Sequence, residues 1–133
     1  MNSFKVVGNL TADPQLKFAN GSGKAYARLR VAESRGEGKD SNFYDVTAFE
    51  SLAENIVDSL HKGDKVIVDG YFDSARTYET GEGETRIALD VIANEVTPSL
   101  RYATVTAIVR NEKSGSATKT EISRAYETEE EPF

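Results

Sequence analysis

Aromatic and arginine side chains recur at alternating positions in the β-type runs of this sequence. In residues 24–32, Arg28 and Arg30 alternate with Ala27, Leu29 and Val31, which gives one cationic and one apolar face. Aromatic rings stack on unpaired bases for roughly 1–3 kcal/mol per base, and guanidinium groups pair with the phosphates between those bases. This combination favours contact with a single nucleic-acid strand. The candidate residues are Arg28, Arg30, Arg35, Phe43, Phe49, Arg76, Tyr78 and Arg86.

Two of these aromatics lie in the run 43–49. A period of two places Phe43, Asp45 and Phe49 on the same side of an extended chain. Buried phenylalanines are common, so an alternative is that both rings belong to the core and that the arginines are simply solvated. The carboxylate of Asp45 on the same face argues against a dry core, because burial of an unpaired charge is costly. We therefore expect an exposed or partly wet surface.

The C-terminal segment is a second candidate site, for a protein partner. A terminal ring preceded by proline and three carboxylates suits a short linear motif, in which the ring fills a pocket and the carboxylates meet a basic rim. The alternative is an acidic tail that only increases solubility. The residues concerned are Glu129, Glu130, Glu131, Pro132 and Phe133.

Other chemistry has weaker support. The stretch 21–24 lacks the glycine and the hydroxyl residue that a phosphate-binding loop requires, and it precedes a strand. His61 has no nucleophile and orienting carboxylate placed with it, so we interpret it as a surface residue. Four aspartates could in principle gather a divalent metal for nuclease chemistry, but each suits a turn or an outward strand position. These are Asp64, Asp69, Asp73 and Asp90.

Composition limits the class of protein. The chain has 133 residues with 16 Lys+Arg and 22 Asp+Glu, a net charge of −6, no Cys and a single His. We therefore expect one small domain without disulfides, thiolate nucleophiles or Cys- and His-based metal sites. No apolar run approaches a membrane span, and residues 1–5 do not resemble a secretory signal, so we expect a soluble, unexported protein with no membrane partner. An acidic total means that nucleic-acid binding must depend on a local patch.

The elements that must position the candidate residues are short β-type runs separated by Gly-rich turns. The run boundaries predict strands, two hairpins at residues 20–23 and 80–84, and one helix after Phe49. In that helix Ser51 and Glu54 match a capping box, Gly63 suits a C-terminal cap, and one apolar stripe faces the core. The stripe consists of Leu52, Ile56, Val57 and Leu60.

This order predicts an all-β fold, a five-stranded OB-fold barrel with one helix between strands 3 and 4. The separate runs 65–72 and 74–79 are expected to be strands, and the alternation in Arg101–Arg110 predicts an added C-terminal strand. We expect residues 1–110 to form this domain. Residues 111–133, which hold three basic and six acidic residues, are expected to form a flexible acidic tail.

The chain resembles the bacterial and phage single-stranded DNA-binding proteins over about residues 3–96. Residues 98–104 and the strand after them also resemble a subgroup from high-G+C bacteria and their phages, in which an added strand clamps subunits together. The stretches that carry the resemblance are Val7–Leu10 with Asp13–Pro14, Asn20–Gly21 with Ala25–Glu33, Asn42–Phe49, Leu52–Gly63, Val66–Gly70 and the tip Glu130–Phe133.

The resemblance implies a non-enzymatic protein without cofactor or metal that binds single-stranded DNA regardless of sequence, in the cytoplasm with the nucleoid. It implies protection of unwound DNA and a homotetramer built from dimers. It also implies a C-terminal tip that recruits replication, recombination and repair proteins. Phe43, Phe49 and Tyr78 match stacking positions, and Lys62 joins the arginines near the strand path.

Three departures from the family pattern affect the expected affinity. The family commonly has Trp where Phe43 and Tyr78 stand, whereas this chain has no Trp, so stacking should be weaker per base. Glu50 and Ser51 stand where the family usually has Gly followed by Lys or Arg, which removes a phosphate contact and adds repulsion. The segment between Arg110 and the tip is also shorter than the usual linker. A protein–protein adaptor on the same fold and a carboxylate-dependent nuclease are the rival hypotheses.

Overall fold

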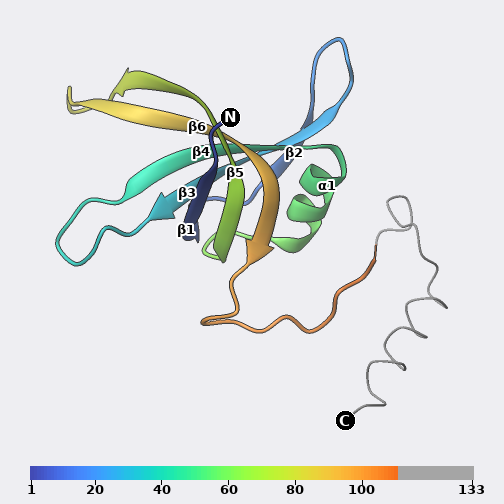
Figure 1. Ribbon diagram of the computed structural model, residues 1–133. Coiled ribbons are helices and arrows are strands. Elements are labelled where there is room, and N and C mark those ends of the chain that lie inside the picture. The colour runs from blue at the N-terminus through green and yellow to red at the C-terminus, as the bar shows by residue number, and fades with distance from the viewer. Residues whose placement is uncertain (111–133) are drawn as a thin grey trace. The chain divides into compact units, whose positions relative to one another are not determined.

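The computed structural model describes residues 1–110, and residues 111–133 lie outside this description. The described part consists of six strands and one helix (Figure 1). The expectation of a mostly β structure with a single helix is confirmed at this level. The strands are β1 (Phe4–Leu10), β2 (Gln15–Phe18), β3 (Ala25–Glu33), β4 (Asn42–Phe49), β5 (Lys65–Glu79) and β6 (Thr85–Pro98), and the helix is α1 (Glu50–Ser59).

The expected count of five strands, with the helix between strands 3 and 4, is wrong by one strand. The β-type run expected at Gln15–Ala19, before the hairpin loop, forms a separate strand, β2, which pairs antiparallel with the first four residues of β3. Four strands therefore precede α1, which lies between β4 and β5. The predicted hairpin at 20–23 joins β2 to β3, closed by the Ala19 N–H donating to the Lys24 carbonyl oxygen at 2.9 Å.

The sheet closes on itself through β1. Its strand order is β1-β5-β6-β4-β3-β2, and β1 also pairs with β3 through Asn9↔Ala32 and Leu10↔Val31. Gly8 permits this close approach, since a Cβ there would lie 2.5 Å from the Ala32 carbonyl oxygen and 2.7 Å from Val31 Cγ1. Any side chain at position 8 would force β1 away from β3.

Strands β5 and β6 form one long antiparallel hairpin. The two strands expected at 65–72 and 74–79 are a single strand, β5, whose pairing with β6 shifts register between Phe72 and Ser74 and again at Gly70. The predicted turn at 80–84 is confirmed, with the Thr80 N–H donating to the Glu84 carbonyl oxygen at 2.8 Å. The turn of this hairpin and the β3–β4 loop extend on the same side, at the left of Figure 1. These two segments enclose one part of the candidate site.

The core lies inside the closed sheet and against α1. Alternating strand residues point inward, and the predicted stripe of α1 is confirmed: Ile56 and Leu60 are buried, and Leu52 and Val57 pack against the same cluster. The alternate strand residues point outward and are therefore not needed for the core. The largest fully buried side chains are Val6, Val31, Val46, Val66, Val68 and Val91.

Both predicted helix caps are wrong. Strand β4 continues to Phe49, so Phe49 takes the N-cap position, without a side-chain cap hydrogen bond, and Ser51 already lies inside α1. Glu50 then has φ +56°, the left-handed region that disfavours any residue except glycine. At the other end Leu60 is the C-cap, because its N–H donates to the Ile56 carbonyl oxygen. Gly63, at φ +93°, serves the next turn, where its N–H donates to the Leu10 carbonyl oxygen at 2.8 Å.

The added strand expected at Arg101–Arg110 is absent from the described chain. Residues 103–110 have no regular secondary structure and are exposed. A strand needs ladder hydrogen bonds to a neighbour, and no described strand of this chain supplies them to these residues. Met1–Ala103 form one compact unit, and a second unit begins at Thr104. No described helix is long and apolar enough to cross a membrane.

Candidate nucleic-acid interface

The candidate residues lie on the outward side of four neighbouring strands. Tyr44, Val46 and Ala48 of β4 are buried, so the alternate β4 residues face away from the core. Strand β3 lies beside β4, with Arg30 opposite Asp45, and β6 and β5 follow on the other side. We call this surface the outer face. It carries Arg28, Arg30, Phe43, Asp45, Thr47, Arg76, Tyr78, Arg86 and Asp90.

Both phenylalanines of β4 face outward. Phe49 is 44% exposed and Phe43 is half-buried, and neither belongs to the core cluster. The alternative in which the two rings form the core is therefore wrong. The physical reason is the period of the strand: Tyr44 and Val46 take the inward positions, which leaves Phe43 and Asp45 on the outside.

One part of the outer face, the aromatic end, is formed by Arg30, Phe43, Tyr78 and Arg86. The Arg30 guanidinium carbon lies 4.8 Å from the centroid of the Phe43 ring, and Arg30 Nη2 donates to the Tyr78 hydroxyl at 3.4 Å. Tyr78 and Arg86 are directly opposite each other in the β5–β6 ladder. The rings and guanidinium groups of two hairpins therefore meet at one place.

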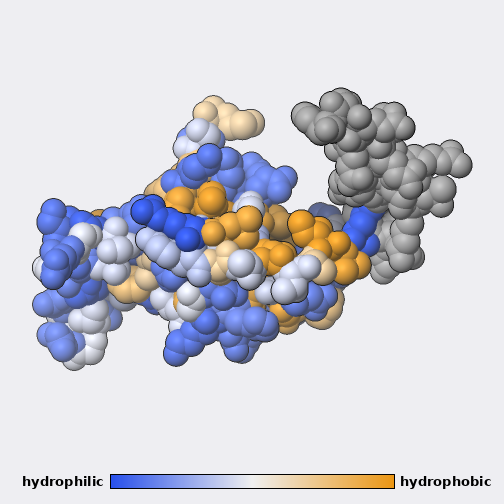
Figure 2. Space-filling view, turned by 90° about the horizontal axis from the view of Figure 1, so that it is seen from below, coloured by the Kyte–Doolittle hydropathy of each residue, from blue (hydrophilic) through white to orange (hydrophobic). Residues whose placement is uncertain are grey.

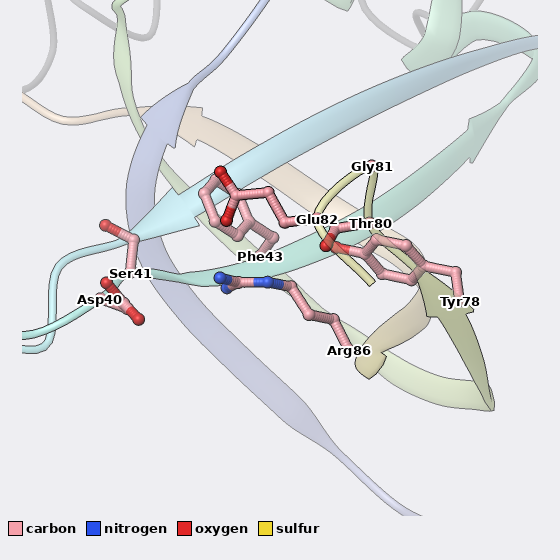
Figure 3. Close-up of a pocket in the computed structure, with 8 residues that line it drawn as sticks. All are labelled: Asp40, Ser41, Phe43, Tyr78, Thr80, Gly81, Glu82 and Arg86. Carbon is pink, nitrogen blue, oxygen red and sulfur yellow. The ribbon is translucent and has the colours of Figure 1, made fainter. Parts of the chain in front are cut away.

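A shallow hollow of about 670 Å³ opens at the aromatic end, between the β3–β4 loop and the β5–β6 turn. Figure 3 shows the Phe43 and Tyr78 rings near the Arg86 side chain, whose guanidinium group points toward Asp40 and Ser41. Arg86 Nη2 is also 3.1 Å from Glu84 Oε2, in an exposed ion pair. The lining is completed by Thr80, Gly81 and Glu82.

A hydrogen-bonded group behind the aromatic end fixes the start of β4. The Tyr44 hydroxyl donates to Glu33 Oε1 at 3.0 Å, and Asn42 Nδ2 donates to the same oxygen at 3.2 Å. Burial raises the pKa of Tyr44 above its usual value, and the hydrogen bond to Glu33 and the charge of Glu33 raise it further. Phe43, between Asn42 and Tyr44 in sequence, is held at the surface by this group.

The second part of the outer face, the ionic centre, consists of Ser74, Arg76, Asp45 and Asp90. Arg76 Nη2 lies 2.9 Å from Asp45 Oδ2, and Arg76 Nε lies 3.4 Å from Asp90 Oδ2. Ser74 Oγ donates to the same Asp90 oxygen at 3.1 Å. Asp45, Arg76 and Asp90 line a hollow of about 500 Å³ that also takes in Asp13, Arg28, Arg30, Thr47 and Asp73. Its four carboxylates outnumber its three guanidinium groups.

Three predicted site residues are not gathered into either hollow. Phe49 is six residues along β4 from Phe43, about 20 Å at the usual rise of a strand. Arg35 is exposed in the β3–β4 loop. Lys62 is exposed in the turn after α1, where its backbone N–H donates to Asp13 Oδ1 at 2.7 Å. The predicted tail site at 129–133 lies outside the described residues.

Asp90 is the residue of the outer face whose role we did not expect. The sequence suggested it only as a possible metal ligand, whereas it pairs with Arg76. The sequence does indicate that Asp90 faces outward. Arg86, Ala88 and Asp90 are spaced by two residues, so they lie on the same face of a strand. Within residues 1–110, no three His, Asp or Glu side chains gather where they could hold a metal ion.

The surface around the aromatic end is hydrophilic. Figure 2, like Figure 1, has the β3–β4 loop and the β5–β6 turn at its left, and this part of the visible face is mostly blue. Hydrophobic residues gather nearer the middle of the same view. The aromatic rings of the outer face thus lie beside polar loops.

Comparisons with known proteins identify the relatives of this chain. Residues 1–99 match the model of the single-strand binding protein family. The "Single-stranded DNA-binding protein" of Mycolicibacterium smegmatis is 44% identical over 108 residues, 74% of this chain and 64% of that protein. The proteins of the same name from Paenarthrobacter aurescens and Corynebacterium glutamicum are 40% and 42% identical, over 84% and 74% of this chain and 70% and 47% of theirs. These are high-G+C bacteria, as the resemblance implied.

Proposed function

The chain belongs to the single-strand binding protein family, and we propose that it binds single-stranded DNA without regard to sequence. The observation that carries this proposal is the aromatic end, where two rings and two guanidinium groups from separate hairpins meet on an outward sheet face. Rings that are partly exposed on a sheet face can stack on bases of any identity, because every base has a π-face. The preference for single strands follows, since a duplex keeps its base faces covered.

The fold supports the same proposal. We infer that the closed sheet is an OB-fold, the partly open barrel on which many oligonucleotide-binding proteins are built. The supporting features are the closure of β1 on β3 and the helix between β4 and β5. In this arrangement the outer face runs across β3, β4, β6 and β5, and Phe49 extends it to the far end of β4.

Stacking should contribute more to binding than phosphate contacts. Arg28 is exposed and in no ion pair among residues 1–110, so it is available to a phosphate; Arg76 is held by two carboxylates. The net charge of −6 also opposes a polyanion outside the immediate contact. The affinity should nevertheless fall as salt rises, because each phosphate that an arginine contacts releases counterions.

The remaining family properties are proposals that rest on the resemblance. We propose a protein that performs no reaction and uses no cofactor, assembled as a homotetramer from dimers. In this proposal it protects unwound DNA during replication, recombination and repair. The tip Glu129–Phe133 would recruit the proteins that act there, with Phe133 in an apolar pocket and the carboxylates on its basic rim. Light scattering of the full chain tests the assembly directly.

The test of the proposed function is replacement of the two outward phenylalanines. The Phe43→Ala/Phe49→Ala protein should lose most of its affinity for a labelled dT oligomer, measured by fluorescence anisotropy, while its circular dichroism stays unchanged. Phe18→Ala is the matched control, because Phe18 is 64% exposed on β2 and lines neither hollow. Undiminished binding by the double variant would favour the adaptor hypothesis instead, with the rings as a protein contact. Cleavage of DNA with Mg²⁺ present would favour the nuclease.

A further inference from the structure

The most unusual feature of the outer face is that a cation predicted to contact DNA already has two anionic partners. Arg76 lies between Asp45 and Asp90, at 2.9 Å and 3.4 Å. We call these three residues the ionic triad. By contrast, no other arginine of the face has a carboxylate on each side among residues 1–110: Arg30 contacts a ring and a hydroxyl, and Arg86 pairs with Glu84.

Strand pairing fixes the triad. β4 and β6 are parallel, and Asp45 is the register partner of Asp90, so the two carboxylates are neighbours on the same face. β5 brings Arg76 beside them, because Ser74 pairs with Asp90 and Arg76 with Ala88. Two adjacent carboxylates repel each other, and the guanidinium group between them removes that repulsion.

The triad is accessible to solvent. The side chain of Arg76 is 54% exposed, and those of Asp45 and Asp90 are 32% and 29% exposed. It shares its hollow with Arg28 and Arg30, so a strand that crosses the outer face from the aromatic end passes directly over it. Ion pairs that are this exposed are weak and can be exchanged for others.

We infer that Asp45 and Asp90 compete with DNA phosphate for Arg76 and thereby limit the affinity of this protein for single strands. This inference rests on the proposed function. A phosphate that approaches Arg76 must displace at least one carboxylate or remain beside both, and either outcome opposes binding. The two aspartates are therefore affinity-determining residues that act through Arg76 rather than through a contact with a base.

The competition has a consequence for salt dependence. An arginine that takes up a phosphate releases the counterions of that phosphate, but a displaced carboxylate attracts a cation in exchange. The triad should therefore reduce the number of ions released on binding. Its removal should make the dependence of affinity on salt steeper by about 0.7 in log–log slope for each phosphate gained.

The test uses the full chain with Asp45→Asn, Asp90→Asn and the double variant. We expect the double variant to bind a labelled dT oligomer about tenfold more tightly at low salt, with the steeper slope, and each single variant to lie between it and the wild type. Asp58→Asn is the matched control: it makes the same charge change at an exposed position of α1, away from both hollows. It should change the affinity less than twofold.

Two results would overturn the inference. One is a double variant that binds no more tightly than the Asp58→Asn control, and the other is weaker binding by a variant whose thermal melting is normal. If the double variant melts at a lower temperature than the wild type, the single variants provide the test, because each retains one carboxylate beside Arg76. Single variants that bind no more tightly than the Asp58→Asn control would then overturn the inference. Failure of the proposed function has a different signature, in which the wild type itself binds single strand and duplex equally.

Discussion

The aromatic end and the ionic centre of the outer face are built by the same strands and differ in how their arginines are used. At the aromatic end Arg30 packs over the Phe43 ring and donates to the Tyr78 hydroxyl, and both of these partners are uncharged. At the ionic centre Arg76 is neutralised by Asp45 and Asp90. Arginines on one sheet face are therefore not equivalent phosphate ligands, because the contacts around each guanidinium group decide its availability.

The largest effect should follow from removal of the rings at the aromatic end. Phe43→Ala and Tyr78→Ala should each weaken dT binding by about tenfold or more, since stacking contributes roughly 1–3 kcal/mol per base. Titration of a labelled oligomer measures this, with Phe18→Ala as the control for loss of an exposed ring. Equal effects of all three variants would show that the aromatic end has no special role.

The next effect distinguishes the arginines of β3. Arg28 and Arg30 are both exposed, but only Arg30 contacts Phe43 and Tyr78. Arg30→Ala should therefore reduce affinity several-fold more than Arg28→Ala, because the ring also loses its support. Arg30→Lys should restore only part of the loss, because an ammonium group does not stack as a planar guanidinium does. If binding depends on charge alone, Arg30→Lys will match the wild type.

A smaller effect concerns Glu50, the first residue of α1, which occupies a left-handed conformation at φ +56°. Glu50→Gly should raise the free energy of unfolding by about 1 kcal/mol, because glycine adopts this conformation without a steric cost. Glu50→Gln keeps the Cβ and removes the charge, so it should leave the stability nearly unchanged. Urea denaturation of both variants separates strain from charge, and a Gln variant as stable as the Gly variant would contradict the steric explanation.

The smallest effect is on stability in alkaline solution. The pKa of Tyr44 is raised in the folded protein, so the folded state holds this proton more tightly than the unfolded chain does. The resulting stability is fully present below the unfolded pKa of about 10 and is lost as the pH rises through the folded value. Denaturation between pH 8 and 11 should therefore show a smaller decline for Tyr44→Phe than for the wild type. Identical declines would mean that Tyr44 ionises equally in both states.

Alternation in the sequence was sufficient to locate most of the strand residues between Phe4 and Pro98 and to predict the orientation of the outer face. The spacing of Phe43, Asp45 and Phe49 depends on strand geometry alone, so it could be predicted without knowledge of the partner strands. The hairpin turns were predictable for the same reason, because glycine-rich turns are local. The stripe of α1 likewise required only helical spacing.

Features that depend on neighbours could not be predicted from alternation. The ionic triad exists because the parallel register sets Asp45 beside Asp90, and that register is a property of the closed sheet. The capping box failed because β4 runs directly into α1, so Phe49 occupies the N-cap before Ser51 can. The expected strand at 101–110 failed because its residues have no pairing partner among the described strands. In each case the outcome depends on what the neighbouring segments of the chain do, which the local pattern does not contain.

The central claim is that the outer face binds single strands by stacking. The most direct measurement is a titration of labelled dT oligomers of increasing length, beside a duplex of matched length, at low and moderate salt. We expect much tighter binding of the single strand, an affinity that grows with length until the outer face is filled, and an affinity that falls with salt. Equal binding of duplex and single strand, or an affinity independent of salt, would contradict it.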